Sequence, residues 1–350
     1  MPVRSTIVAL AITLLLLVAS PAASGAGPSG AFFGVVAQES PRAADLDRMR
    51  GVVGSLRVPV FWFQLEPRPG EYELGPLDEM VSAAARRGVR VMPFVYGSPG
   101  WLRSDPARPP HTSPRGRAAW AAFMRVLVRR YGPAGAFWQD RPERLPIRRW
   151  QIWNEPNFTL FWRPRPSAAG YVRLLRIAAR AIRGADPGAR VVMAGVAPVK
   201  RGIAPVGFLK RMYRARGAPA AFDVAALHPY ATRVRHVATY VHRTRRAMAR
   251  AGDGAKPLRI TELGVASGGL RRSPYDKGAE GQAIYLFDAY RMLLKRRGRW
   301  RIGGVDWFSW RDTAADDPYC VFCQYSGLLD ADGSPKPAWR AMRAVSASVR

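Results

Sequence analysis

Residues 150–157 read WQIWNEPN, and residues 258–264 read LRITELG. Each stretch contains a short apolar run that predicts a buried β-strand, and a glutamate follows the run, Glu155 in the first stretch and Glu262 in the second. In a (β/α)8 barrel, side chains at the carboxyl ends of the strands gather at one mouth of the barrel. The two stretches therefore predict a barrel with a pair of carboxylates at that mouth.

Strand-like and helix-like segments alternate along the rest of the chain, which favours an α/β fold. The pattern predicts a single closed (β/α)8 TIM barrel. The alternative is an open doubly wound sheet, but the first strand is not followed by the Gly-x-Gly-x-x-Gly turn that would indicate a nucleotide. The predicted strands are 31–36, 55–60, 89–94, 149–153, 190–195, 223–227, 258–261 and 304–308. The predicted helices are 41–49, 76–87, 114–131, 167–185, 207–216, 234–251 and 276–297, with a last one from 337 onward.

The N-terminal residues predict a secretory signal peptide over 1–26. Arg4 precedes an apolar run over 7–18, and small residues follow over 20–26. The run is too short to span a bilayer, although an uncleaved anchor is the alternative. Residues 27–350 contain no Ser/Gly-rich or low-complexity linker, so we expect one catalytic domain, a secreted or cell-surface location and no transmembrane span after processing.

The chain is strongly basic, with a formal net charge of +30, and nearly all of its cations are arginines. Clusters at 243–246 and 295–299 fall on predicted helix surfaces, where solvated charge is usual. A basic exterior favours anionic partners such as a cell-surface polymer. No helix-turn-helix, zinc-finger or RNA-binding signature accompanies the arginines, so we expect no specific nucleic-acid partner.

Two facing carboxyl groups are the chemistry that cleavage of a glycosidic bond requires. One carboxyl group must stay protonated to donate to the leaving oxygen, and the other must be ionised to attack the anomeric carbon or to activate water. Strands four and seven lie across an eight-stranded barrel from one another. Their glutamates can therefore face each other across a bound sugar.

The motifs around the glutamates resemble those of clan A glycoside hydrolases, and most closely the cellulase-like family 5 and the family 39 xylosidases and iduronidases. Asn154-Glu155-Pro156 resembles the acid/base motif that ends strand four, and Ile260-Thr261-Glu262 resembles the nucleophile strand. The resemblance implies a retaining β-glycoside hydrolase that acts on a polysaccharide or oligosaccharide. It also implies a covalent glycosyl-enzyme intermediate, with Asn154 as a donor to a sugar 2-hydroxyl.

Other strand ends extend the resemblance in the expected order over residues 31–340. Arg57 resembles the strand-two arginine that orients the nucleophile, and His228 and Tyr230 match a His-x-Tyr feature on strand six. Residues 307–310 (WFSW), with Trp307 and Trp310, resemble the aromatic floor under the scissile sugar. The strand-three segment 92–96 lacks the histidine found in much of family 5, which leaves the family and the substrate open.

Tryptophans that follow predicted strands are candidates for stacking on sugar rings, because a pyranose presents apolar C–H groups to an aromatic face. Packing in the core is the equally weighted alternative for each of them. The candidates are Trp62, Trp101, Trp162, Trp307 and Trp310.

The two cysteines, Cys320 and Cys323, follow strand eight, and in an exported chain a disulfide is the first expectation. A metal site is not expected, because there is no second cysteine pair and the histidines are scattered. We expect no cofactor and a monomer. The rival interpretations are a carbohydrate-binding barrel without efficient catalysis and a basic surface protein that binds anionic polymers.

Overall fold

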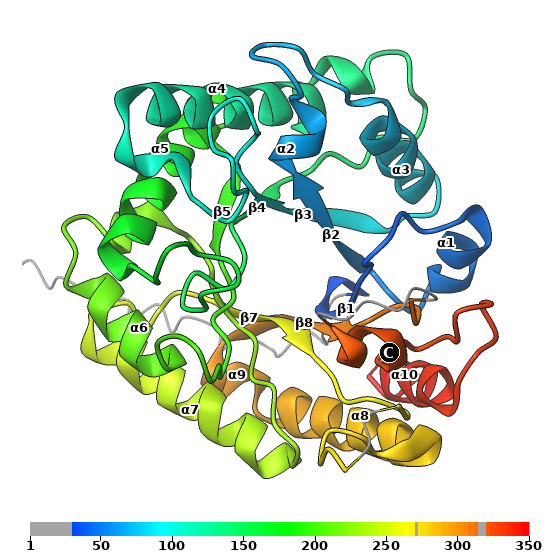
Figure 1. Ribbon diagram of the computed structural model, residues 1–350. Coiled ribbons are helices and arrows are strands. Elements are labelled where there is room, and N and C mark those ends of the chain that lie inside the picture. Colours follow the sequence, from blue (N-terminus) through cyan, green and yellow to red (C-terminus); the bar gives the residue numbers. More distant parts are fainter. Residues whose placement is uncertain (1–29, 270–271, 314–319, 350) are drawn as a thin grey trace, which may run out of the picture.

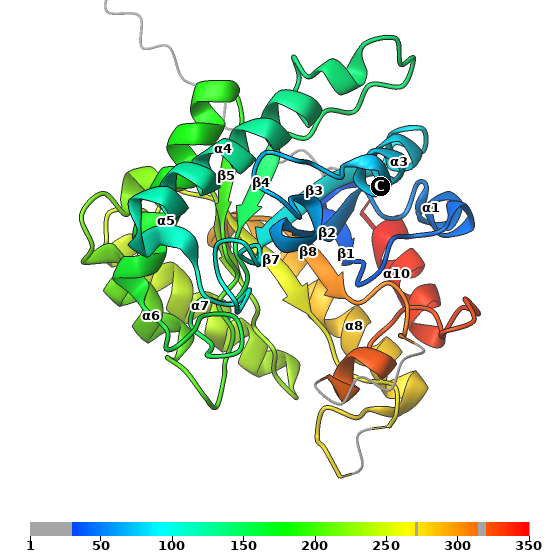
Figure 2. The same cartoon turned by 45° about the horizontal axis from the view of Figure 1, so that its top comes forward.

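The computed structural model describes residues 30–269, 272–313 and 320–349, and these form a barrel. Eight parallel strands make one sheet in the order β5-β4-β3-β2-β1-β8-β7-β6. Bridges from Val192 to Val224 and from Val196 to Leu227 join the β5 and β6 sides and close the barrel. Figure 1 looks along the barrel, with the helices arranged around the strands, and Figure 2 shows it tilted. The predicted fold class is confirmed.

The strand bounds agree with the sequence prediction to within three residues at each end. The strands are β1 (Phe33–Val36), β2 (Ser55–Phe61), β3 (Arg90–Tyr96), β4 (Arg149–Ile152), β5 (Arg190–Met193), β6 (Ala225–Leu227), β7 (Leu258–Leu263) and β8 (Ile302–Phe308).

The helices cover the outside of the barrel and follow the strands in sequence. The α-helices are α1 (Ala43–Met49), α2 (Trp62–Leu65), α3 (Gly75–Ala85), α4 (Pro114–Tyr131), α5 (Ala168–Ala185), α6 (Pro205–Tyr213), α7 (Val234–Arg250), α8 (Gly278–Lys295), α9 (Arg297–Trp300) and α10 (Pro337–Ala347). Short 3-10 helices are η1 (Gly30–Phe32), η2 (Pro110–Thr112), η3 (Ala136–Trp138), η4 (Pro219–Ala221) and η5 (Val321–Tyr325).

The starts of α4 and α1 show one prediction from capping chemistry confirmed and one corrected. Ser113 caps α4 as the Ser-Pro pair predicts, because its hydroxyl accepts a hydrogen bond from the Gly116 amide at 3.1 Å. The first helix, predicted to open after Ser40, begins instead at Ala43. The Arg42 amide there donates to the Asp45 carboxylate at 2.9 Å, which satisfies a free N–H at the helix start.

The lower part of the barrel interior is held by a buried ion pair. Arg259 on β7 donates to both carboxylate oxygens of Asp306 on β8, at 2.8 and 2.5 Å. Gly34 on β1 leaves the space that this carboxylate fills, since a Cβ there would overlap Asp306. Charge pairing therefore replaces apolar packing in this layer, and the polar residues of the mouth lie above it.

Residues 1–26, the predicted signal peptide, lie outside the described residues. Within 30–269, 272–313 and 320–349, no helix combines the length and the apolar character that crossing a bilayer would require.

Candidate active site

The end of β4 carries Asn154 and Glu155 on a backbone that ordinary residues rarely adopt. Trp153 has φ +72° and Glu155 has φ +35°, both in the left-handed region. The buried Trp153 indole holds this turn, because its Nε1 donates to the Phe161 carbonyl at 2.7 Å. Strained backbone that tertiary packing maintains is typical of functional sites, and here it presents Glu155 to the mouth.

The end of β7 presents two neighbouring side chains to the interior. Side chains alternate between the two faces of a regular strand. Between Ile260 and Leu263, however, the β7–β8 register shifts, as in a β-bulge. As a result, both Thr261 and Glu262 contact residues inside the barrel.

Arg57 on β2 links the ends of β4 and β7. Its guanidinium lies 2.6 Å from Glu262 Oε1 and donates to Asn154 Oδ1 at 3.0 Å, and its Nε donates to Gln151 Oε1 at 2.6 Å. The group is fully buried and lies 3.9 Å from the centre of the Phe94 ring. Phe94 belongs to the strand-three segment that lacks a histidine. Because Arg57 occupies Asn154 Oδ1, the Asn154 amide NH2 remains as a donor toward a ligand.

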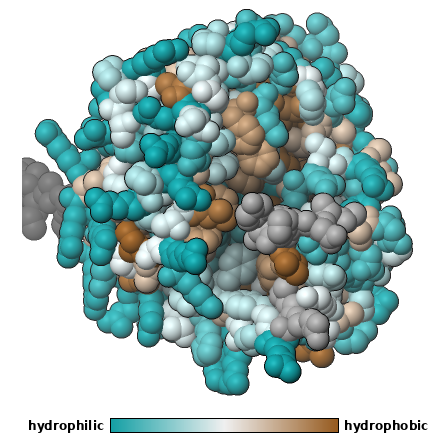
Figure 3. All heavy atoms as spheres, viewed as in Figure 1, coloured by the Kyte–Doolittle hydropathy of each residue, from teal (hydrophilic) through white to brown (hydrophobic). Residues whose placement is uncertain are grey.

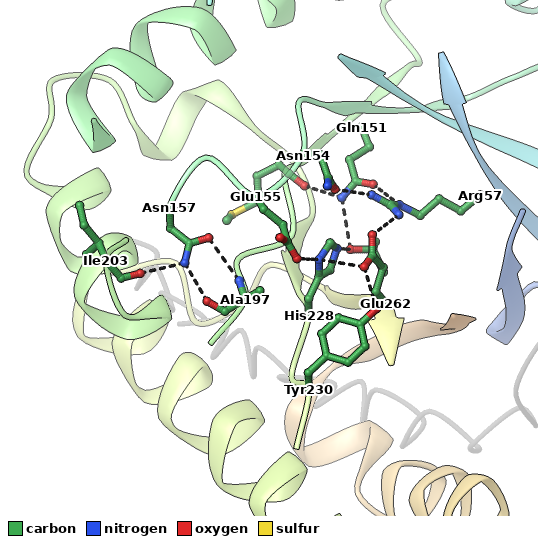
Figure 4. A network of polar contacts seen from close by, with 12 residues as sticks. Arg57, Gln151, Asn154, Glu155, Asn157, Ala197, Ile203, His228, Tyr230 and Glu262 are labelled. Carbon is green, nitrogen blue, oxygen red and sulfur yellow. Dashed lines mark hydrogen bonds and ion pairs between the residues drawn. The ribbon is translucent and has the colours of Figure 1, made fainter. Parts of the chain in front are cut away.

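His228 follows β6 and lies between the acidic groups (Figure 4). Its Nδ1 is 2.8 Å from Glu155 Oε1 and 3.4 Å from Glu262 Oε2, and its Nε2 is 2.9 Å from Thr261 Oγ1. Gln151 donates to Thr261 Oγ1, which frees the Thr261 hydroxyl to donate to Nε2. Neutral His228 then carries its hydrogen on Nδ1 and donates a hydrogen bond from it to Glu155 Oε1.

Two neighbouring features fix the position of the His228 ring and complete the surroundings of Glu262. Gly195 makes room for the ring, since a Cβ at that position would overlap it. Tyr230 donates its hydroxyl to Glu262 Oε2 at 2.8 Å. Glu262 therefore receives hydrogen bonds on both oxygens, one from Arg57 and one from Tyr230, and is held in one orientation.

The two glutamates have different electrostatic surroundings. Burial, and secondarily the charge of Glu262, raises the pKa of Glu155 well above its usual value. Burial also raises the pKa of Glu262, but Arg57 and Tyr230 oppose this effect. Burial and the nearby Arg57 lower the pKa of His228 well below its usual value, so this ring is neutral. The site thus favours a protonated Glu155 beside an ionised Glu262, because burial raises both pKa values but only Glu262 receives hydrogen bonds from Arg57 and Tyr230.

The facing atoms of Glu155, His228 and Glu262 all lie within 4.8 Å of one another. Such a group could also ligate a metal ion. However, the Arg57 guanidinium already pairs with Glu262 at 2.6 Å, and its charge would repel a second cation. The arrangement is better suited to chemistry by two carboxyl groups.

For Trp62, the core-packing alternative holds and the sugar-stacking alternative is wrong. Because α2 begins at this residue, its indole turns into the core, where it is fully buried and stacks on Phe123 with ring centroids 5.4 Å apart. Trp101 lies edge-on to Trp62 and donates its Nε1 to the Glu66 carbonyl at 2.9 Å, so it too belongs to this cluster. Trp162 is likewise buried.

The aromatic side chain that β8 presents to the mouth is Phe308, and Trp307 and Trp310 are not available to a ligand. Trp307 is fully buried and donates to the Ser326 carbonyl at 3.1 Å, and Trp310 is buried edge-on against Trp339. Side chains alternate along β8, so Phe308 shares the inward side of Asp306, two residues earlier. The half-buried Phe308 ring lies edge-on to Tyr230, with ring centroids 6.3 Å apart.

A row of half-buried aromatic residues lines the side of the mouth formed by β2, β3 and the loop after β4, and the sequence analysis missed it. Neighbouring ring centroids in the row lie 5.3–6.2 Å apart. Figure 3 shows a mostly hydrophilic face with hydrophobic residues gathered near its middle. The row consists of Phe61, Phe63, Tyr96, Phe161 and Phe158.

Cys320 and Cys323 form a disulfide, with Cα atoms 5.3 Å apart. The loop that they close places Phe322 against the site, where its ring stacks on Phe308 and lies edge-on to Tyr230, at centroid distances of 6.0 and 5.7 Å. The disulfide therefore shapes one wall of the mouth.

Gln151 and Thr261 are further site residues that the sequence analysis did not single out. Both are fully buried polar residues within otherwise apolar strands. A polar side chain in such a strand has to find a partner inside the barrel, and this signal was available in the sequence.

No protein-family model matches this sequence, and no curated protein matches it either. Solved structures do match its fold. A family 39 glycoside hydrolase from Bacteroides cellulosilyticus WH2 matches with a TM-score of 0.66 and 21% identity, and the alignment covers 91% of this chain but only 64% of that one. A monomeric β-xylosidase from Caulobacter crescentus CB15 gives 0.67 and 19%, covering 92% and 69% of the two chains. A GH5_18 structure from Streptomyces cattleya gives 0.66 and 21%, covering 88% and 74%.

The chain therefore spans less than two thirds of the length of the family 39 enzyme, and all three identities lie below 25%. Similarity at this level establishes the fold, and it agrees with the resemblance of the motifs. The chain has the barrel fold of the glycoside hydrolases of families 39 and 5.

Proposed function

We propose that this protein is a retaining β-glycoside hydrolase. The observation that carries the proposal is the pair of buried carboxyl groups, Glu155 and Glu262, whose facing atoms lie within 4.8 Å. Retaining glycosidases hold their two carboxyl groups about 5–5.5 Å apart, whereas inverting ones need about 6.5–9.5 Å to admit a water molecule. The 4.8 Å bound applies to the facing oxygens rather than to the carboxyl centres, and it fits the retaining spacing and direct attack by one carboxylate.

The hydrogen bonds assign the two roles. Glu262 is oriented by Arg57 and Tyr230, so its carboxylate attacks the anomeric carbon while the bond to the leaving oxygen breaks. Glu155, with its raised pKa, donates a proton to that oxygen. Glu155 then takes a proton from water, whose oxygen attacks the anomeric carbon and releases Glu262.

Variants of the two glutamates test the mechanism on a panel of aryl β-xylosides, β-glucosides and β-mannosides. Glu262→Ala should abolish both chemical steps. Glu155→Ala should still release a good leaving group, and added azide should rescue its turnover and yield a β-glycosyl azide. Glu73 is an exposed glutamate in the loop before α3, so Glu73→Ala is the matched control and should behave as the wild type.

The stereochemistry of the first product decides between the mechanisms. NMR of the wild-type reaction should show the β-anomer before mutarotation. An α-anomer would overturn the retaining assignment. Full activity of Glu262→Ala would overturn the two-carboxylate mechanism, whereas a wild type that hydrolyses none of the panel would favour a carbohydrate-binding or basic surface role.

Export and retention at an anionic cell surface are a further part of the proposal. Support comes from the signal-like residues 1–26 and from the net charge of +30. A secreted monomer that begins near residue 27 should appear in the culture medium. Its binding to anionic polymers should weaken as added salt shortens the Debye length below about 10 Å. A cytoplasmic chain that retains residues 1–26 would contradict export.

A further inference from the structure

An open pocket of about 370 Å³ lies beside the candidate active site. The pocket and the site share Tyr230, which lines the pocket and donates its hydroxyl to Glu262. The loop after β6 and Tyr275, in the loop after β7, form other walls. Tyr230 therefore lies between this pocket and the two glutamates.

One face of α7 forms the far wall of the pocket. His236, Tyr240 and Arg243 lie four and three positions apart, so they fall on the same side of the helix and line the cavity together. The helix holds five arginines, two histidines and no acidic residue. The potential at this wall is therefore positive.

Arg243 is the cation best placed to meet a ligand there. Its side chain is exposed, and it makes no ion pair or hydrogen bond within residues 30–269, 272–313 and 320–349. Asp276, next to Tyr275, accepts a hydrogen bond from the Gly278 amide at the start of α8. The guanidinium thus keeps its donors for an anion, and its planar fork matches a carboxylate or a sulfate group.

Aromatic rings connect this cation to the catalytic groups. Tyr275 lies edge-on to Phe322, and Phe322 lies edge-on to Tyr230, at centroid distances of 6.2 and 5.7 Å. Rings of this kind offer apolar faces to pyranose C–H groups. The order of the parts is therefore carboxyl pair, aromatic rings and cation.

We propose that this pocket binds the anionic substituent of a sugar that neighbours the cleaved one, and that the protein selects acidic glycans. The inference rests on the proposed glycosidase function, because it assumes that the glycan occupies the candidate active site. Arg243 forms the charge-assisted hydrogen bonds, His236 adds a polar contact, and the tyrosines hold the ring. The chemistry required is a carboxylate or sulfate group on a polymer of sugars.

Binding to a Glu262→Gln variant tests the pocket without requiring hydrolysis. The carboxylate probes are glucuronoxylan and hyaluronan fragments, each paired with its carboxyl-reduced form. The sulfate probe is a carrageenan fragment paired with its desulfated form. Calorimetry should show at least one acidic probe binding about tenfold more tightly than its neutral partner, as expected for one charge-assisted contact.

Substitutions at Arg243 then test whether this residue causes the preference for the acidic probe. Adding Arg243→Ala to the Glu262→Gln protein should remove the preference for the acidic member of the pair, and Arg243→Lys should restore part of it. Arg246→Ala is the matched control, because it removes the same charge from the same helix outside the pocket, and it should keep the preference.

Each outcome bears on a separate claim. The pocket assignment is overturned if no acidic probe binds better than its neutral partner, or if Arg246→Ala reduces the preference as much as Arg243→Ala. An Arg243-dependent preference in a protein whose wild type hydrolyses neither these probes nor the aryl glycosides would keep the pocket and refute the proposed function. The carboxylate and sulfate probes distinguish the two sources of the negative charge.

Discussion

Replacing Arg57 with Met should separate the structural and catalytic roles of the buried pair with Glu262. The guanidinium is fully buried and serves Glu262, Asn154 and Gln151. Removing one partner of a buried ion pair typically costs about 3–5 kcal/mol of unfolding free energy. The amide oxygens of Asn154 and Gln151 also lose a donor, at about 1–3 kcal/mol each where no water replaces it. We expect a loss of about 5 kcal/mol, a large part of the 5–15 kcal/mol typical of a folded protein.

A double-mutant cycle tests whether the unpaired charge of Glu262 causes the loss of stability in Arg57→Met. With Glu262→Gln added, the uncompensated carboxylate is gone, so the double variant should be more stable than Arg57→Met alone, with a coupling of about 2 kcal/mol. Recovery should be partial, since Asn154 and Gln151 still lack their donor. Urea unfolding followed by tryptophan fluorescence measures all four proteins. Additive losses would refute the argument that the ion pair holds this site together.

The pH dependence of activity provides a second measurement on the same residue. Arg57 opposes the rise in the pKa of Glu262 that burial causes. Arg57→Lys, which keeps the charge but loses contacts, should therefore show an acidic limb of kcat/KM closer to wild type than Arg57→Met does. For Arg57→Met, we expect the limb to move to higher pH and kcat to fall by about 100-fold, because the nucleophile is no longer oriented. An unmoved limb would show that Arg57 does not set the ionisation of Glu262.

Three further predictions concern the surroundings of the site. The pKa of Glu155 is raised in the folded state, so the stability of the wild type should fall as pH rises from about 4.3, the pKa of a glutamate in an unfolded chain, through the folded-state pKa. The increase in urea midpoint caused by Glu155→Gln should therefore be small near pH 4 and larger at pH 8. An equal increase at both pH values would contradict the raised pKa. Replacing Cys320 and Cys323 with Ser should cost about 2 kcal/mol or less and raise KM as the loop loosens, so an unchanged KM would argue against contact between this loop and substrate. Phe308→Ala should lower kcat/KM with little effect on the free energy of unfolding, whereas Trp307→Ala should lower the free energy of unfolding by about 3–5 kcal/mol. The reverse pattern would show that Trp307, and not Phe308, faces the mouth.

The order of the strands, most helix starts and the two glutamates are properties that the sequence determines by itself. These features depend on local chemistry. Apolar runs predict buried strands, Ser113 caps the helix that follows it, and the glutamates stand directly after two such runs. Parallel strands in a closed barrel then place Glu155 and Glu262 at the same mouth, whatever the details of packing.

The direction of each side chain at the strand ends was decided only by the tertiary structure. Successive residues of a strand point to opposite faces, so a difference of one position exchanges Phe308 for Trp307. A local pattern cannot set this choice, because packing against α-helices on one side and the barrel interior on the other decides it. The bulge that turns both Thr261 and Glu262 inward is another such feature, and it depends on pairing with β8. The pKa order of the two glutamates likewise follows from burial and from Arg57, a residue distant in sequence that only the closed barrel brings to the site.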